Sequence, residues 1–236
     1  MKHNIFLFTL MLSISALFAS CSQNEEVYSC DKSTNQWVVD NLSMVRGMNR
    51  QQWKELPSDK KIAAYRAFSP DQKISFWEDK LCELNKLPWS TREKEHINKI
   101  GEFIHSHEYF FERERLSPEE ENELELFFYK WTSFAVENLG WTKQLAYAIA
   151  GTGYSIQNTS GELNIEEPIF TKSMEKGKRP DCHCKINNPL ACFPGGAGIC
   201  DRADCTEVKP GCGWLLLETC DGMCDGTLID NPVIIE

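Results

Sequence analysis

Apolar residues recur three or four positions apart through the middle of the chain, from about Gln36 to Thr152. This spacing places them on one face of an α-helix. The three longest groups are Ile74, Trp77, Leu81 and Leu84; Ile97, Ile100, Ile104 and Phe111; and Leu124, Phe127, Trp131 and Ala135. Two shorter stretches, Ser58 to Phe68 and Trp141 to Gly151, follow the same spacing. Strand patterns are nearly absent before residue 160, so the sequence predicts an all-helical domain of five or six helices over residues 36–156.

Three serines indicate where the long helices begin. Ser69, Ser90 and Ser117 each stand three residues before a Gln or Glu, and Pro directly follows Ser69 and Ser117. In such a capping box the serine side chain and the later Gln or Glu satisfy backbone N–H groups that the helix itself leaves unbonded. We therefore expect a helix to begin directly after each serine.

The pattern changes beyond residue 156. Residues 157–181 are rich in Asn, Ser, Gly, Pro and charged side chains, which is typical of a linker. In residues 182–236 the clearest strand signal is Trp214 to Glu218, and Leu228-Ile229 and Val233 to Ile235 are weaker ones. The predicted fold class is mainly α, with an all-helical N-terminal domain followed by a small disulfide-rich C-terminal module that has short strands.

Eleven cysteines divide into groups along the chain. Eight lie close together near the C-terminus: Cys182, Cys184, Cys192, Cys200, Cys205, Cys212, Cys220 and Cys224. A segment of this size cannot bury enough apolar surface to be stable alone, so four disulfides are expected, in one of 105 possible pairings. Two further cysteines, Cys30 and Cys82, lie in the helical region, and we expect them to form a fifth disulfide.

Zinc is the alternative use for such a cysteine cluster, and Cys182-His183-Cys184 fits its ligand chemistry. The spacing argues against it. Between successive cysteines lie one, seven, seven, four, six, seven and three residues, so no Cys-x-x-Cys pair presents two thiolates to one ion. The sequence therefore predicts no metal and no other cofactor.

The N-terminus has the layout of an export signal. A short basic start is followed by an apolar run from Ile5 to Phe18, which predicts a signal peptide over residues 1–20. Phe18-Ala19-Ser20-Cys21 resembles a bacterial lipobox, which implies lipid attachment at Cys21; an ordinary signal cleaved near Ala19 is the alternative. Residues 21–35 would then be a lipid-anchored tether. The acidic stretch Ser22 to Glu26 resembles export tags of surface-displayed lipoproteins, so the expected location is the bacterial cell envelope, at the outer membrane.

The net charge of −10 excludes a nucleic-acid partner, because phosphate backbones are bound by clustered Lys and Arg. It also disfavours anionic lipid surfaces as targets. The remaining partners are the membrane, through the N-terminal lipid, and an unknown protein partner or receptor. One basic cluster, Lys176, Lys178 and Arg179, precedes the first cysteine of the module and is a candidate cleavage region.

Three motifs with catalytic residue types have a structural explanation. His105 and His107 are two positions apart, which directs them to different sides of a helix. The acidic residues Glu119 to Glu121 fall in a first helical turn, where negative charge offsets the helix dipole. The Gly151 to Ser155 stretch follows a helix and reads as a helix stop. The sequence thus contains no catalytic candidate, and we do not expect an enzyme.

The C-terminal motifs resemble those of fulvocin C, a small cysteine-rich bacteriocin. They are the opening Cys182-His183-Cys184, then Cys192, Cys200, Cys205-Thr206, the Gly211-Cys212-Gly213-Trp214 element, and the close formed by Cys220, Asp221-Gly222 and Cys224. The whole chain is similar to exported fulvocin C-related bacterial proteins. The match of the cysteine-rich motifs covers about a fifth of the chain, and the resemblance implies a compact four-disulfide fold and growth-inhibiting activity against other bacteria.

Two functions follow from these observations. The first is a lipid-anchored envelope protein whose bacteriocin-like module acts on competing bacteria. Nine acidic residues against three basic ones between Asp181 and Glu236 indicate that its target would be a protein receptor rather than an anionic membrane. The alternative is a non-toxic binding or structural envelope lipoprotein, in which the stapled module is an interaction surface or a protective cap.

Overall fold

The computed structural model describes residues 26–164, 182, 184–186, 190, 192, 200–202 and 208–224. Their architecture is mainly helical, which confirms the predicted fold class. The α-helices are α2 (Lys32–Asp40), α3 (Leu42–Arg46), α4 (Arg50–Lys54), α5 (Ser58–Ala67), α6 (Pro70–Leu84), α7 (Thr91–Ser106), α8 (Tyr109–Glu112), α9 (Pro118–Leu139) and α10 (Lys143–Ala150). The 3-10 helix η2 (Trp214–Leu216) and the strands β1 (Cys200–Arg202) and β2 (Gly222–Cys224) belong to the cysteine-rich part.

The three predicted capping boxes are present. The hydroxyls of Ser69, Ser90 and Ser117 accept from backbone N–H groups at the starts of α6, α7 and α9. In each case the side chain of the Gln or Glu three residues later accepts from the backbone N–H of the serine. A fourth box at Asn49 begins α4. Because these bonds satisfy N–H groups that no helical carbonyl can reach, they fix where each helix starts.

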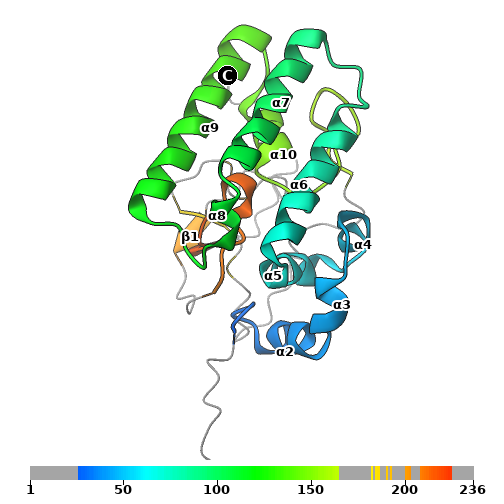
Figure 1. The fold of residues 1–236 in the computed structure, drawn as a ribbon, viewed down its shortest axis with the longest axis vertical. Helices are drawn as coiled ribbons and strands as arrows, with labels where there is room; N and C mark the ends of the chain where they lie inside the picture. Colours follow the sequence, from blue (N-terminus) through cyan, green and yellow to red (C-terminus); the bar gives the residue numbers. More distant parts are fainter. Residues whose placement is uncertain are drawn as a thin grey trace, which may run out of the picture.

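The long helices α6, α7 and α9 run side by side, and the shorter α2 to α5 lie at one end of them (Figure 1). The apolar stripes predicted for α6, α7 and α9 face one another, and Trp77, Ile100 and Leu124 are completely buried. Burial of this kind contributes roughly 1.5–3 kcal/mol for each large apolar side chain. In the part of the chain that the structure describes, no helix is long and apolar enough to cross a membrane.

The N-terminal part of the fold extends further than the predicted domain boundary. Residues 21–35 were expected to be a tether, but α2 begins at Lys32 and the Tyr28 side chain is buried in the main core. Asp31 caps α2 by accepting from the Thr34 backbone N–H at 2.7 Å. The ordered body therefore includes at least residues 26–35 as well.

Residues 157–164, the first part of the predicted linker, form an ordered loop. Ile156 pairs with Leu163, and the Gln157 N–H donates to the Glu162 carbonyl oxygen at 2.7 Å. Gly161 adopts a positive φ of 85° at the turn. Residues 165–181 lie outside the described residues.

The predicted strand from Trp214 to Glu218 is wrong, because this stretch contains η2. Leu215 and Leu216 have φ values of 52° and 55°, which no strand residue adopts. The Cys212–Cys220 bridge and the pairing of Cys212 with Glu218 close this stretch into a tight loop. The only two-stranded sheet among the described residues is the antiparallel β1–β2 pair, in which Cys200 lies opposite Cys224.

Candidate functional site

The cysteine-rich residues between Cys182 and Cys224, here called the stapled segment, form the candidate site. Its bridges are Cys184–Cys200, Cys192–Cys224 and Cys212–Cys220, with Cα–Cα distances of 6.0, 5.6 and 5.3 Å. Cys182 is also disulfide-bonded. Cys205, the eighth predicted member, lies outside the described residues. Every predicted disulfide cysteine of this segment that the structure describes is thus in a bridge.

Three of these cysteines lie close enough to hold a metal ion. The sulfur atoms of Cys184, Cys192 and Cys224 are within 4.8 Å of one another. Zinc binds thiolates, however, and each of these sulfur atoms is joined to another sulfur atom in a disulfide. In the oxidised protein the group therefore has no thiolate to offer.

The predicted bridge between Cys30 and Cys82 is absent. Cys82 is an exposed free thiol on α6. Cys30 lies just before Asp31, the N-cap of α2, and α2 packs against α5. An even number of cysteines says nothing about distance, and a disulfide needs Cα atoms about 5–6 Å apart.

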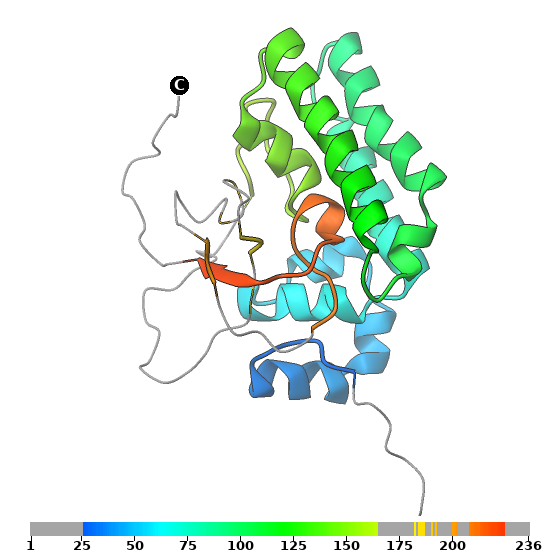
Figure 2. The ribbon, with the colours of Figure 1, turned by 90° about the vertical axis from the view of Figure 1, so that its left-hand side faces the viewer.

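The 3-10 helix η2 joins the stapled segment to the helical core. Leu215, Leu216 and Leu217 belong to the same buried cluster as Trp77 and Phe128. The Trp214 ring stacks on Phe128 with a centroid distance of 4.6 Å. Figure 2 shows η2 beside α9 and α10, with β2 leading away from it.

The strained turn is held by hydrogen bonds as well as by packing. The carbonyl oxygen of Leu215 accepts from the Tyr65 hydroxyl at 3.1 Å and from the Trp77 indole N–H at 3.0 Å. Both donors are buried and come from α5 and α6. Positive φ at a leucine costs roughly 1–2 kcal/mol, so these contacts must outweigh the strain at Leu215 and Leu216.

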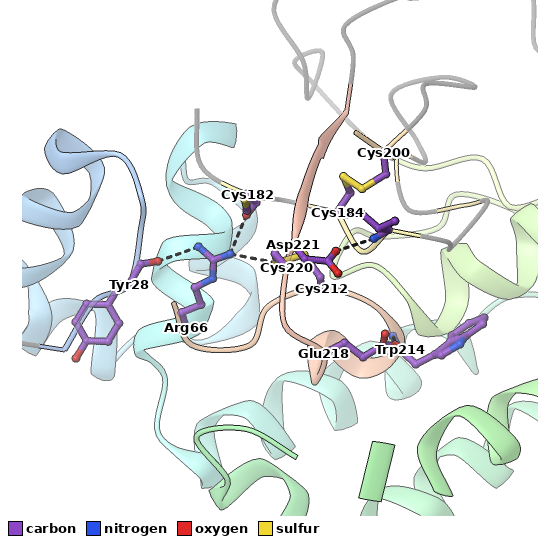
Figure 3. The surroundings of a disulfide bond; sticks show 11 residues. Tyr28, Arg66, Cys182, Cys184, Cys200, Cys212, Trp214, Glu218, Cys220 and Asp221 are labelled. Atoms are coloured by element: carbon purple, nitrogen blue, oxygen red, sulfur yellow. Dashed lines mark hydrogen bonds between the residues drawn. A yellow bond between two sulfur atoms is a disulfide. The ribbon is translucent and has the colours of Figure 1, made fainter. Parts of the chain in front are cut away.

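Arg66 connects three distant parts of the chain (Figure 3). Its side chain is only 1% exposed, and its guanidinium donates to the carbonyl oxygens of Tyr28 at 3.0 Å and Cys182 at 2.8 Å. A further contact of 3.1 Å reaches the Cys220 sulfur. Arg66 therefore holds the N-terminal residues and the stapled segment against α5.

A buried carboxylate closes the η2 loop from the other side. Glu218 accepts from the Trp214 backbone N–H at 2.9 Å and lies against Gly213, where an added Cβ would overlap the carboxylate. Burial raises the pKa of Glu218 to about 7; the Trp214 N–H and Lys185 oppose this rise, and Glu125 and Glu121 add to it. No sequence pattern indicates this buried carboxylate, because its burial depends on the packing of η2.

The two histidines of the His105-Ser106-His107 motif have different surroundings. His105 is exposed on α7, with Glu78 and Glu108 at 3.5 and 3.4 Å. His107 follows the helix, stacks on Phe103 at a centroid distance of 4.1 Å and contacts Glu123 at 3.1 Å. The two rings therefore do not lie at one site. The spacing of the motif predicted this separation.

The Gly151 to Ser155 stretch ends α10, as expected, and brings Ser155 to a polar cluster that the sequence did not reveal. The Ser155 hydroxyl accepts from Lys54 at 2.9 Å, and Glu83 accepts from Lys54 at 3.3 Å and from Arg50 at 2.6 Å. Burial alone would raise the pKa of Glu83, but bonds from Ser155 and Arg50 and the charges of Arg50 and Lys54 lower it to about 2. Glu83 is 29 positions from Lys54 in the sequence and Ser155 is 101 positions from it, so no local pattern indicates the cluster.

Several predicted functional residues lie outside the described residues. They are the lipid-attachment cysteine, Cys21, and the candidate cleavage residues Lys176, Lys178 and Arg179.

Comparison of the chain with family models, curated proteins and solved structures gave no significant match.

Proposed function

We propose that the chain is an exported bacterial envelope protein, anchored through a lipid on Cys21, that binds its partner as one folded unit. The observation that carries this proposal is the packing of the stapled segment into the helical core through η2. In this proposal the disulfides stabilise a binding protein and do not define a separate effector. This proposal corresponds to the second of the two functions that the sequence predicts, the binding or structural envelope lipoprotein.

The disulfides support export. The three described bridges and the bonded Cys182 need an oxidising compartment, because cytosolic reductants keep thiols reduced. The signal-like N-terminus and Cys21 fit the same route.

Packing argues against release of the stapled segment as a free effector. Separation would return three buried leucines of the η2 region to water, at roughly 2 kcal/mol each. The sum of about 6 kcal/mol is comparable with the whole stability of a typical domain. Release would also leave the Tyr65 hydroxyl without its acceptor and the Trp77 indole N–H with only the Tyr65 hydroxyl oxygen.

The lipid anchor is tested by expressing the full chain in a Gram-negative host and separating membrane from soluble fractions. We expect intact protein in the membrane fraction and an acyl mass on Cys21. The Cys21→Ser variant should lose both, while Cys82→Ser, which changes an exposed thiol, should lose neither. Cytosolic protein with reduced cysteines would contradict the proposal.

The role of the stapled segment is tested on the culture supernatant and on target bacteria. A free fragment starting near residue 181, cut in the basic cluster, would contradict the single-unit proposal. Growth inhibition of related bacteria by the purified oxidised protein would favour the bacteriocin-like function. Absence of inhibition across a broad panel would favour the binding role.

A further inference from the structure

A cavity of about 250 Å³ lies between the α4–α5 region and the segment after α10. Its wall is formed from one side by residues of Gln51 to Lys61 and from the other by Tyr154, Ser155 and Asn164. At about 30 Å³ for each water molecule, its volume equals roughly eight waters. That is the size of a monosaccharide or a small organic acid.

The residues that line the cavity are held in place by buried neighbours behind them, which do not themselves line it. Arg50 is buried, donates to the Gly153 carbonyl oxygen at 3.1 Å and pairs with Glu83. Gly153 itself lies so close to Trp53 and Phe76 that an added Cβ would meet both rings at 2.6 Å. The fully buried Lys80 donates to the Ala148 carbonyl oxygen at 2.6 Å and to that of Thr152. A site held in this way needs little ordering when a ligand binds.

The charge at the cavity differs in sign from that of the whole protein. Arg50, Lys54 and Lys61 lie in or beneath it, against the two carboxylates of Glu55 and Glu83. Among the residues that the structure describes, these charges sum to +1, in a chain of net charge −10. A positive recess in an acidic surface selects small anions, because larger anionic surfaces are repelled by the rest of the molecule.

Lys54 has a donor left for such an anion. Its ammonium has three N–H groups, and two of them are directed to Ser155 and Glu83. The Tyr154 ring, which packs against Trp53 at 5.7 Å, provides an apolar wall beside it. The exposed amides of Gln51 and Asn164 add polar groups at the edge.

We infer that this cavity binds a small hydroxylated organic anion, with the charged group at Lys54 and the carbon skeleton on Tyr154. The inference rests on the proposed binding function and gives its ligand class. Carboxylate and phosphate groups share the required chemistry. Both are therefore tested.

The experiment is calorimetric titration of the full chain, purified with its disulfides intact, with glucuronate and with glucose 6-phosphate. Glucose is the neutral control, at matched ionic strength. We expect saturable binding of at least one anion and none of glucose. Lys54→Met should weaken binding about tenfold or more, since a charged hydrogen bond is worth roughly 1.5–3 kcal/mol.

Lys60→Met is the matched control, because Lys60 is the neighbour of Lys61 but lies over Trp37, away from the cavity. It removes the same charge and should change the affinity by less than about twofold. If Lys54→Met fails to fold, Lys61→Met provides the same test at the outer wall. Equal weakening by Lys60→Met, equal binding of glucose, or no saturable binding of either anion up to about 10 mM would overturn the inference.

Failure of this titration can be told apart from failure of the proposed function. Fractionation and mass analysis of Cys21 involve no ligand. An exported, lipid-anchored protein that binds neither anion would contradict the cavity inference alone.

Discussion

The buried side chain of Arg66 bonds to parts of the chain that are far apart in the sequence. Its guanidinium reaches Tyr28, Cys182 and Cys220, which belong to the N-terminal residues and the stapled segment. Carbonyl oxygens that lose such a donor while buried each cost roughly 1–3 kcal/mol.

We therefore expect Arg66→Met, which keeps the length of the side chain, to lower the free energy of unfolding by about 3 kcal/mol. Arg46→Met is the control, because the Arg46 side chain is 48% exposed and its ion pair with Glu26 should contribute less than about 1 kcal/mol. Urea unfolding without reductant measures both. Arg66→Met within 1 kcal/mol of the wild type would contradict the role assigned to Arg66.

Glu218 makes stability depend on pH. Its folded pKa of about 7 lies above the ordinary value of 4.5, so the folded protein holds the proton more tightly than the unfolded chain does. This contribution is complete below about pH 4.5 and is lost as the pH rises to about 7, a change on the order of 3 kcal/mol.

The Glu218→Gln variant should not lose this stability between pH 4.5 and 7, because the amide keeps an oxygen for the Trp214 N–H and carries no charge. Glu102→Gln, at an exposed position within α7, should keep the wild-type dependence. Denaturation midpoints at several pH values give the comparison. Parallel curves for the wild type and Glu218→Gln would show that Glu218 is not protonated in the folded protein.

At the scale of elements, helix starts could be predicted and the η2 loop could not. Ser69, Ser90 and Ser117 form their caps within four residues, so the local sequence is sufficient to place them. The conformation of Leu215 is set by Tyr65 and Trp77, about 140 to 150 residues away, and by the short Cys212–Cys220 loop. A run of apolar residues cannot report contacts of that range, which is why Trp214 to Glu218 reads as a strand. The Lys54–Ser155 cluster was missed for the same reason.

Alanine substitutions at two glycines with positive φ can distinguish the stability cost of backbone strain from that of steric overlap. Gly140 has a φ of 71° with open space where a Cβ would stand, whereas a Cβ on Gly213, at a φ of 66°, would overlap Glu218. We expect Gly140→Ala to cost about 1 kcal/mol and Gly213→Ala at least about 3 kcal/mol, with both measured by thermal unfolding. Equal losses would mean that the η2 loop shifts easily to make room.

At the scale of the whole molecule, the shared core predicts a single unfolding transition. The η2 leucines and the helical stripes bury one another, so neither part keeps its core when the other unfolds. Under non-reducing conditions, the loss of helical circular dichroism and the change in tryptophan fluorescence should coincide. Two separate transitions would indicate that the stapled segment is an independent domain after all.

The docking of η2 onto α5 and α6 also bears on how the cysteines find their partners. Eight cysteines allow 105 pairings, and the segment has little apolar surface of its own to choose among them. The helical body can act as a template, because contacts of Leu215 with Tyr65 and Trp77 bring Cys212 and Cys220 into one arrangement. The helices precede the cysteines in the chain and are synthesised first, so the template is available before the last thiols are oxidised.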